Sequence, residues 1–228
     1  MHTGGRYIKD IIYGANDGII TTFAVVAGVA GADLSPAIVI LLGAANLFAD
    51  GFSMAASNYL GSKSERDFVR KEHDGVERDL ADAPREEQNE MIALLQEQGY
   101  GKEDAPLLAR LMFKNKEFFV DLMMHEELEL SSHAREGIMR KAAATFIAFV
   151  GMGFIPIIPF LFLSSTAHLF AYSVGATGAA LFLVGSLRSL VTKNSWIFSG
   201  LEMLVVGGIA ASIAYVVGAF LKSAVGVF

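Results

Sequence analysis

NLFADGFSMAASNYLGSKSE, residues Asn46 to Glu65, is the stretch that decides how this chain folds. It ends an apolar segment and runs without a break into a charged one. Asn46, Asp50, Met54 and Asn58 recur at four-residue intervals, which places them on one stripe of a helix. A carboxylate and a thioether therefore share a stripe within a helix that we expect to span a bilayer. Because an ionised group is costly in hydrocarbon, such a group is usually present for function.

The composition is that of a membrane protein with a polar insert. Of 228 residues, 53% are hydrophobic and 18% are charged, whereas soluble domains carry about a quarter charged residues. The mean hydropathy is +0.46. Roughly three quarters of the Asp, Glu, Lys and Arg residues lie between Gly61 and Lys141. The absence of cysteine excludes a disulfide framework and a thiolate metal site. The net charge of -6 argues against nucleic acid as a partner.

We predict an all-α fold with five transmembrane helices and a helical insert between the second and third. A span needs roughly 20 apolar residues. The apolar runs of that length are, approximately, residues 11–32, 37–60, 142–163, 166–187 and 196–221. The corresponding domains are residues 1–62 (helices one and two), 63–140 (the insert) and 141–228 (helices three to five).

Local signals refine this outline. Pro156 and Pro159 should kink the third span. The small residues of Gly28–Ala32 permit close helix packing, most simply within one subunit. In the insert, Pro84 suits the first turn of a helix, and Asn115 suits the cap of a helix from Lys116 to Arg140.

The basic residues of the short loops predict the orientation. The links after the first and third spans contain no Lys or Arg, and Lys222 near the C-terminus is the exception to the pattern. The other ends of the spans carry Arg6, Lys9, Lys63, Arg66, Arg140, Lys141, Arg188 and Lys193. We therefore expect a cytosolic N-terminus and a cytosolic insert, in a bacterial inner membrane or an organelle membrane.

The first candidate site is intramembrane. Asp10 and Asp17 are seven residues apart on one helical face, and Gly14 between them leaves that face open. Because the first two spans are antiparallel neighbours, we expect Asp17, Asp50 and Met54 to converge. Carboxylates and a thioether suit a divalent first-row metal such as Fe(II) or Mn(II). The alternative is that Asp17 bonds to a neighbouring helix and that Met54 is packing. The amide oxygens of Asn46 and Asn58 are further candidate ligands.

The second candidate site is in the insert. Acids recur there at helix-face spacing, and a pair of methionines lies beside acids in a third helix, a pattern that resembles a carboxylate-bridged metal site. Solvated acidic faces are the alternative. The candidate ligands are Glu72, Asp79, Glu87, Glu90, Met123, Met124 and Glu127.

Three motifs together resemble the vacuolar iron transporter family over essentially the whole chain. They are DIIYGANDGIITTFAVVAG (Asp10–Gly28), DGFSMAASNYLGSKSE (Asp50–Glu65) and DLMMHEELEL (Asp121–Leu130). The resemblance implies a homodimer with its pathway near the subunit interface. It also implies proton-coupled transport of Fe(II), and often Mn(II), out of the cytosol, with the insert as a metal-binding domain.

The resemblance also assigns residues. Asp17 of the DG motif and Met54 of the SM motif become ligands of the translocation path. Plant members of the family carry a glutamate where Asn46 stands, so that Asp50 takes over its role. In the insert, one family glutamate falls on Asp79 and its partner falls near Val76, so that either Glu72 or Glu77 substitutes for the partner or this ligand is lost. The remaining metal ligands map to Glu87, Glu90, Met123, Met124 and Glu127.

Other functions remain open at this point. The insert could serve a membrane-anchored metal sensor or a di-metal oxidase, although it has no Glu-x-x-His pair of the kind that di-iron sites use. A channel is an alternative to an antiporter. The sequence has no phosphate-binding loop and no support for a hydrolase triad, so we expect neither an enzyme nor an organic cofactor.

Overall fold

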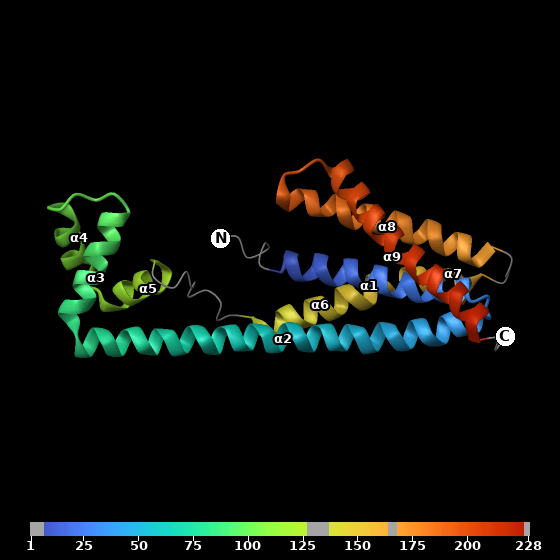
Figure 1. The fold of residues 1–228 in the computed structure, drawn as a ribbon, viewed down its shortest axis with the longest axis horizontal. Helices are drawn as coiled ribbons and strands as arrows, with labels where there is room; N and C mark the ends of the chain where they lie inside the picture. The colour runs from blue at the N-terminus through green and yellow to red at the C-terminus, as the bar shows by residue number, and fades with distance from the viewer. Residues whose placement is uncertain (1–6, 127–136, 164–167, 226–228) are drawn as a thin grey trace. The chain divides into compact units, whose positions relative to one another are not determined.

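The computed structural model describes residues 7–126, 137–163 and 168–225, and all regular elements in these ranges are helices (Figure 1). Five of the described helical segments are long and apolar enough to cross a membrane. The predicted all-α fold with five candidate spans is therefore confirmed. In chain order the elements are α1 (Ile8–Gly31), α2 (Pro36–Asp82), α3 (Pro84–Glu97), α4 (Asp104–Met112), α5 (Lys116–Glu126), α6 (Ile138–Gly153), the 3₁₀ turn η3 (Ile155–Ile157), α7 (Ile158–Phe162), α8 (Leu169–Thr192) and α9 (Trp196–Val225).

The chain forms two compact units. The membrane unit comprises Met1–Tyr59 and Met139–Phe228, and the insert unit comprises Leu60–Ile138. Helix α2 contributes to both, because its 47 residues run unbroken from Pro36 to Asp82. A span needs roughly 20 residues, so α2 is more than twice as long as one span. The predicted continuation of the second span into a charged helix is confirmed.

In the membrane unit, α1 packs against both α8 and α9, and α8 packs against α9. Glycines make the closest approaches. A Cβ at Gly218 of α9 would collide with the backbone carbonyl of Gly28 in α1, and a Cβ at Gly31 would collide with Tyr215. The small residues around Gly28 therefore serve helix packing within one subunit, as predicted.

The third span is broken where prolines were expected to kink it. Helix α6 ends at Gly153, and the chain continues through η3 into α7, with a proline in the first turn of each. The hydroxyl of Ser173 in α8 donates a hydrogen bond of 2.7 Å to the carbonyl oxygen of Pro156. This bond satisfies a backbone group at the break, which a bilayer interior would otherwise leave unpaired.

The insert unit has its own apolar core, formed by the C-terminal part of α2 with α3, α4 and α5. Pro84 starts α3, and the amide of Phe118 donates to Oδ1 of Asn115, so both terminus signals are confirmed. The predicted helix from Lys116 to Arg140 is wrong at its end, because Gly137 has a φ of 80°, which an α-helix does not accommodate. The buried core residues are Val69, Leu80, Met91, Leu95, Ala105, Ala109, Phe119, Val120, Met123 and Met124.

Candidate metal-binding sites

The predicted intramembrane stripe is half-buried within the single chain. Asp17 on α1 and the α2 residues Asn46, Asp50 and Met54 all have intermediate exposure. The carboxylates of Asp17 and Asp50 lie close enough to act on each other electrostatically. Two half-buried acids from neighbouring spans therefore lie within electrostatic range of each other.

Glycine contacts on α1 and α2 set the position of this stripe. Gly18, next to Asp17, is buried so tightly against the carbonyl of Phe149 in α6 that a Cβ would overlap it. On α2, a Cβ at Gly51 would lie 3.2 Å from the ring of Phe149. Because α6 contacts both helices beside their acids, it fixes the carboxylate-bearing turns of α1 and α2 together.

Met54 packs on an apolar cluster formed by Leu47, Phe149 and Ile157. One side of its side chain therefore contributes to packing, as the alternative interpretation predicted. Its partial exposure still leaves thioether surface on the stripe. The packing interpretation and the ligand interpretation are compatible at this residue.

A hydrogen-bond network lies further along the same faces. Nδ2 of Asn58 donates to Oδ1 of Asp10 at 2.9 Å and to Oγ1 of Thr145 at 2.8 Å. The hydroxyl of Thr145 in turn donates to the carbonyl oxygen of Lys141 at 3.0 Å. Asn58 thus joins α2 to α1 and to α6.

Asn16, which directly precedes Asp17, was not named by the sequence analysis. Its Oδ1 is buried and has no hydrogen-bond partner in the structure. A buried amide oxygen usually has a partner. The signal in the sequence was an amide directly beside the acid of a span. Asn16 was not predicted because it does not share the face of the first span that carries Asp10 and Asp17.

The insert site is divided by burial. Glu87 on α3 is only 9% exposed, and Met123 and Met124 on α5 are 0% and 2% exposed. Met91 lies one turn after Glu87 and packs in the same core as both α5 methionines. The nearly buried carboxylate of Glu87 therefore lies one turn from a core that contains three methionines.

The other predicted insert ligands are less enclosed. Glu72 is half-buried, whereas Asp79 and Glu90 are exposed. Glu127 lies outside the described residues. The position expected to carry a further family glutamate, Val76, packs against the apolar core.

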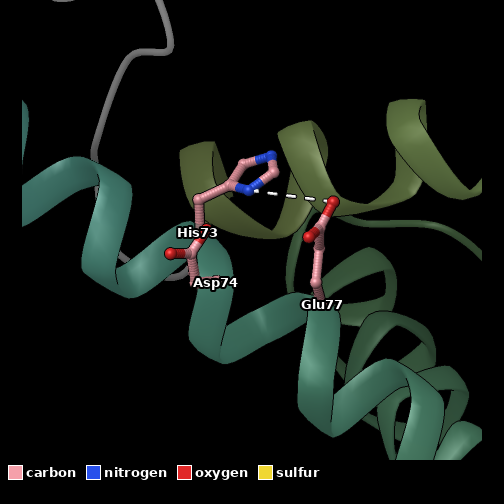
Figure 2. A group of neighbouring side chains, drawn as sticks. All are labelled: His73, Asp74 and Glu77. Atoms are coloured by element: carbon pink, nitrogen blue, oxygen red, sulfur yellow. Dashed lines mark ion pairs between the residues drawn. The ribbon is translucent and has the colours of Figure 1, made fainter.

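A different group of ligand-type side chains lies on one face of α2 (Figure 2). His73, Asp74 and Glu77 offer ligand atoms within 4.8 Å of one another, and Nδ1 of His73 is 3.9 Å from Oε1 of Glu77. Figure 2 shows the His73 and Glu77 side chains leaning toward each other from successive turns. Both line an open hollow together with Glu117 and Asp121 of α5. Glu77 was predicted as a substitute ligand, whereas its pairing with His73, four residues earlier on the same helix, was not predicted.

The VIT family model matches residues 8–219, which is nearly the whole chain. The chain belongs to the VIT family. The alignments with its relatives cover most of this chain and most of each relative. The vacuolar iron transporter of Plasmodium falciparum is 35% identical over 95% of this chain and 82% of its own length. That of Plasmodium berghei is 34% identical over 95% and 83%. Vacuolar iron transporter 1 of Arabidopsis thaliana is 30% identical over 93% and 85%. These VIT proteins are named as transporters and not as enzymes.

Two ion pairs of this VIT chain lie away from the stripe. Arg188 of α8 is 3.3 Å from Glu202 of α9, which explains the acid near the start of that apolar helix. Lys222 of α9 is 2.8 Å from Asp33, in the turn between α1 and α2. These two pairs thus neutralise charges at the ends of spans within the chain, as intramembrane charges usually are neutralised.

Proposed function

We propose that this protein carries Fe(II), and also Mn(II), out of the cytosol across a membrane in exchange for protons. Membership of the VIT family and the names of its relatives support iron transport across a membrane. The five apolar helices support an integral membrane protein. The distribution of basic residues supports a cytosolic N-terminus and a cytosolic insert.

The observation that carries the proposal is that α6 contacts α1 and α2 directly beside Asp17 and Asp50, at Gly18 and Gly51, which keeps two half-buried carboxylates of neighbouring spans within electrostatic range of each other. With Met54 and the amide of Asn46 on the same stripe, they offer oxygen and sulfur donors. Hard carboxylate oxygens with one softer thioether suit Fe(II) and Mn(II) better than an all-thiolate site would. The stripe is therefore suited to a divalent first-row cation as substrate.

The same two acids support exchange for protons. Two carboxylates held close together in a medium of low dielectric repel each other strongly. A divalent cation relieves this repulsion on one side of the membrane, and protons relieve it after the cation leaves. Alternation between bound metal and bound proton at one carboxylate then couples the two fluxes.

Partial exposure of the stripe supports a homodimer. In a single chain, Asp17, Asp50 and Met54 are only half-buried, so part of each side chain would face lipid. A charged group facing hydrocarbon is strongly disfavoured. A second copy that covers this face would enclose the path between two subunits.

The insert acts in this proposal as a cytosolic metal-binding domain. Glu87, Met123 and Met124 form its enclosed part, and Glu72, Asp79, Glu90 and Glu127 supply further carboxylates. The insert would thereby collect cytosolic Fe(II) before the ion enters the path. No resident organic cofactor is needed for this function.

The test is metal flux into proteoliposomes that contain the purified full chain. Fe(II), Mn(II) and Zn(II) are offered with and without an imposed pH gradient. We expect Fe(II) uptake that follows the gradient and is abolished by Asp17→Asn, with Asp104→Asn in the insert as a matched control that retains flux. Normal transport by a correctly folded Asp17→Asn protein would refute the proposal. Flux independent of the gradient would instead indicate a channel, and metal binding without flux would indicate a sensor or an oxidase.

A further inference from the structure

Asn58 uses its side-chain amide to join three helices of the membrane unit. It donates to the carboxylate of Asp10 on α1 and to the hydroxyl of Thr145 on α6. An ionised carboxylate only accepts hydrogen bonds, so the nitrogen of the Asn58 amide is the atom that must face Asp10. The Thr145 hydroxyl donates its hydrogen to the carbonyl oxygen of Lys141, so it accepts the hydrogen bond from Asn58.

The residues of this network lie on the same faces of α1 and α2 as the intramembrane stripe. On α2, Asn58 follows Met54 by one turn and Asp50 by two turns. On α1, Asp10 precedes Asp17 by seven residues, with Gly14 between them. A Cβ at Gly14 would lie 2.5 Å from the carbonyl oxygen of Thr145, so α1 and α6 are already in backbone contact at this level.

The position of the Asp10 carboxylate therefore depends on a residue of another helix. Asp10 is half-buried near the start of α1, about two turns before Asp17 along the predicted direction of travel. A hydrogen bond to a charged acceptor is stronger than one between neutral groups. The bond from Asn58 thus holds the Asp10 carboxylate in place on the face of α1 that also carries Asp17.

We propose that Asn58, supported by Thr145, is a positioning residue that holds the Asp10 carboxylate on the route of the divalent cation. This inference rests on the proposed transport function. Asn58 acts through its amide hydrogens and not as a ligand of the ion. Its effect is on capture of the cation, because Asp10 precedes the acid pair on the stripe.

Initial rates of Fe(II) uptake by the full chain in proteoliposomes, measured over a range of Fe(II) concentrations and normalised to folded protein, test this role. We expect Asn58→Leu, which is similar in size but cannot donate, to raise KM by about three- to tenfold with little change in the maximal rate. Thr145→Val should raise KM less, and Thr145→Ser should restore it because the hydroxyl is kept. The Thr145 pair tests the network even if Asn58→Leu does not fold.

A double-mutant cycle distinguishes positioning from ligation. If Asn58 acts through Asp10, adding Asn58→Leu to Asp10→Asn leaves KM where Asp10→Asn alone has put it. Multiplying effects of the two changes would overturn the proposal. So would an unchanged KM in both Asn58→Leu and Thr145→Val, or a loss of folded protein in either with a wild-type KM.

The outcome also separates this inference from the transport proposal. When Asp17→Asn abolishes uptake but Asn58→Leu and Thr145→Val keep the wild-type KM, the positioning role alone is refuted. When Asp17→Asn transports Fe(II) normally, the proposed path is refuted and the role of Asn58 is refuted with it.

Discussion

Nζ of Lys222 lies 2.8 Å from Oδ2 of Asp33, although the two residues are 189 positions apart in the chain. The pair joins the last turns of α9 to the turn between α1 and α2. Lys222 was the one basic residue that did not fit the predicted orientation. The ion pair shows that Lys222 lies at the same end of the bundle as the turn between α1 and α2, the end that we predict to face away from the cytosol.

Asp33→Asn should lower stability at neutral pH and have little effect in acid. The hydrogen bond from Lys222 and its charge hold the pKa of Asp33 below its ordinary value. The folded chain then binds this proton less readily than the unfolded chain. The stabilisation is therefore present above the ordinary pKa of aspartate and is lost as pH falls through the lowered pKa. Thermal unfolding of the detergent-purified chain against pH measures it.

Asn is the matched replacement, because Asp33 has a φ of 57° and Asn tolerates this left-handed backbone about as well. Lys222→Met should give the same pH dependence as Asp33→Asn, and the double variant should lose no more than either single one. A stability gap between Asp33→Asn and wild type that persists unchanged in acid would show that the ion pair is not its cause.

Gly18→Ala should destabilise the membrane unit, whereas Gly151→Ala should not. A Cβ at Gly18 would overlap the backbone carbonyl of Phe149, which cannot swing aside as a side chain can. Overpacking of this kind costs about 1–3 kcal/mol. A Cβ at Gly151, in the contacting helix α6, meets nothing within 4 Å, and alanine there should gain up to about 1 kcal/mol of helix propensity. Unfolding by denaturing detergent compares the two variants, and equal stabilities would contradict the packing argument.

Met123→Leu should separate packing from metal binding in the insert. Leucine nearly conserves the volume of methionine, so the stability loss should stay under about 1.5 kcal/mol. Loss of a thioether ligand should weaken Fe(II) binding by about tenfold or more. Titration of Fe(II) into the full chain in an Asp17→Asn background measures binding with the contribution of the path reduced. Met112→Leu, at a half-buried position on the same core, is the control, and equal affinities of the two variants would identify Met123 as packing alone.

Arg188→Met should destabilise the contact between α8 and α9. It leaves the exposed carboxylate of Glu202 without its partner at 3.3 Å, and loss of such an exposed pair costs up to about 1 kcal/mol. Adding Glu202→Gln to Arg188→Met should recover part of that loss. Lys193→Met, which changes a neighbouring exposed base, should have a smaller effect. A thermal unfolding series compares these variants, and no recovery in the double variant would mean that the ion pair is not the source of the stability.

The helices themselves were largely predictable, because their signals are local. An apolar run of span length, a proline at Pro156 or Pro84 and the unbroken pattern after Asn46 act through backbone geometry within a few residues. The same locality explains the error after Lys116, where the left-handed φ of Gly137 ends the predicted helix. Helical periodicity alone does not predict where a single glycine ends the helix.

Burial of the insert acids was not predictable in this way. Glu87 and Glu90 are the same residue type and lie three residues apart on α3, yet Glu87 is buried and Glu90 is exposed. The difference depends on how α3 is rotated toward the apolar core that Met91 shares with Met123 and Met124. Helical spacing places acids on a common face but does not say which neighbour that face meets.

The sequence by itself determined that this chain has five apolar spans, a charged helical insert and an acid stripe on its first two spans. Only the tertiary structure decided that Asn58 bonds to Asp10 and Thr145, that Gly18 meets Phe149 and that Lys222 pairs with Asp33. The reason is geometric. A hydrogen bond or a glycine contact between helices depends on the depth and rotation of each helix, and these are set by the packing of the whole bundle.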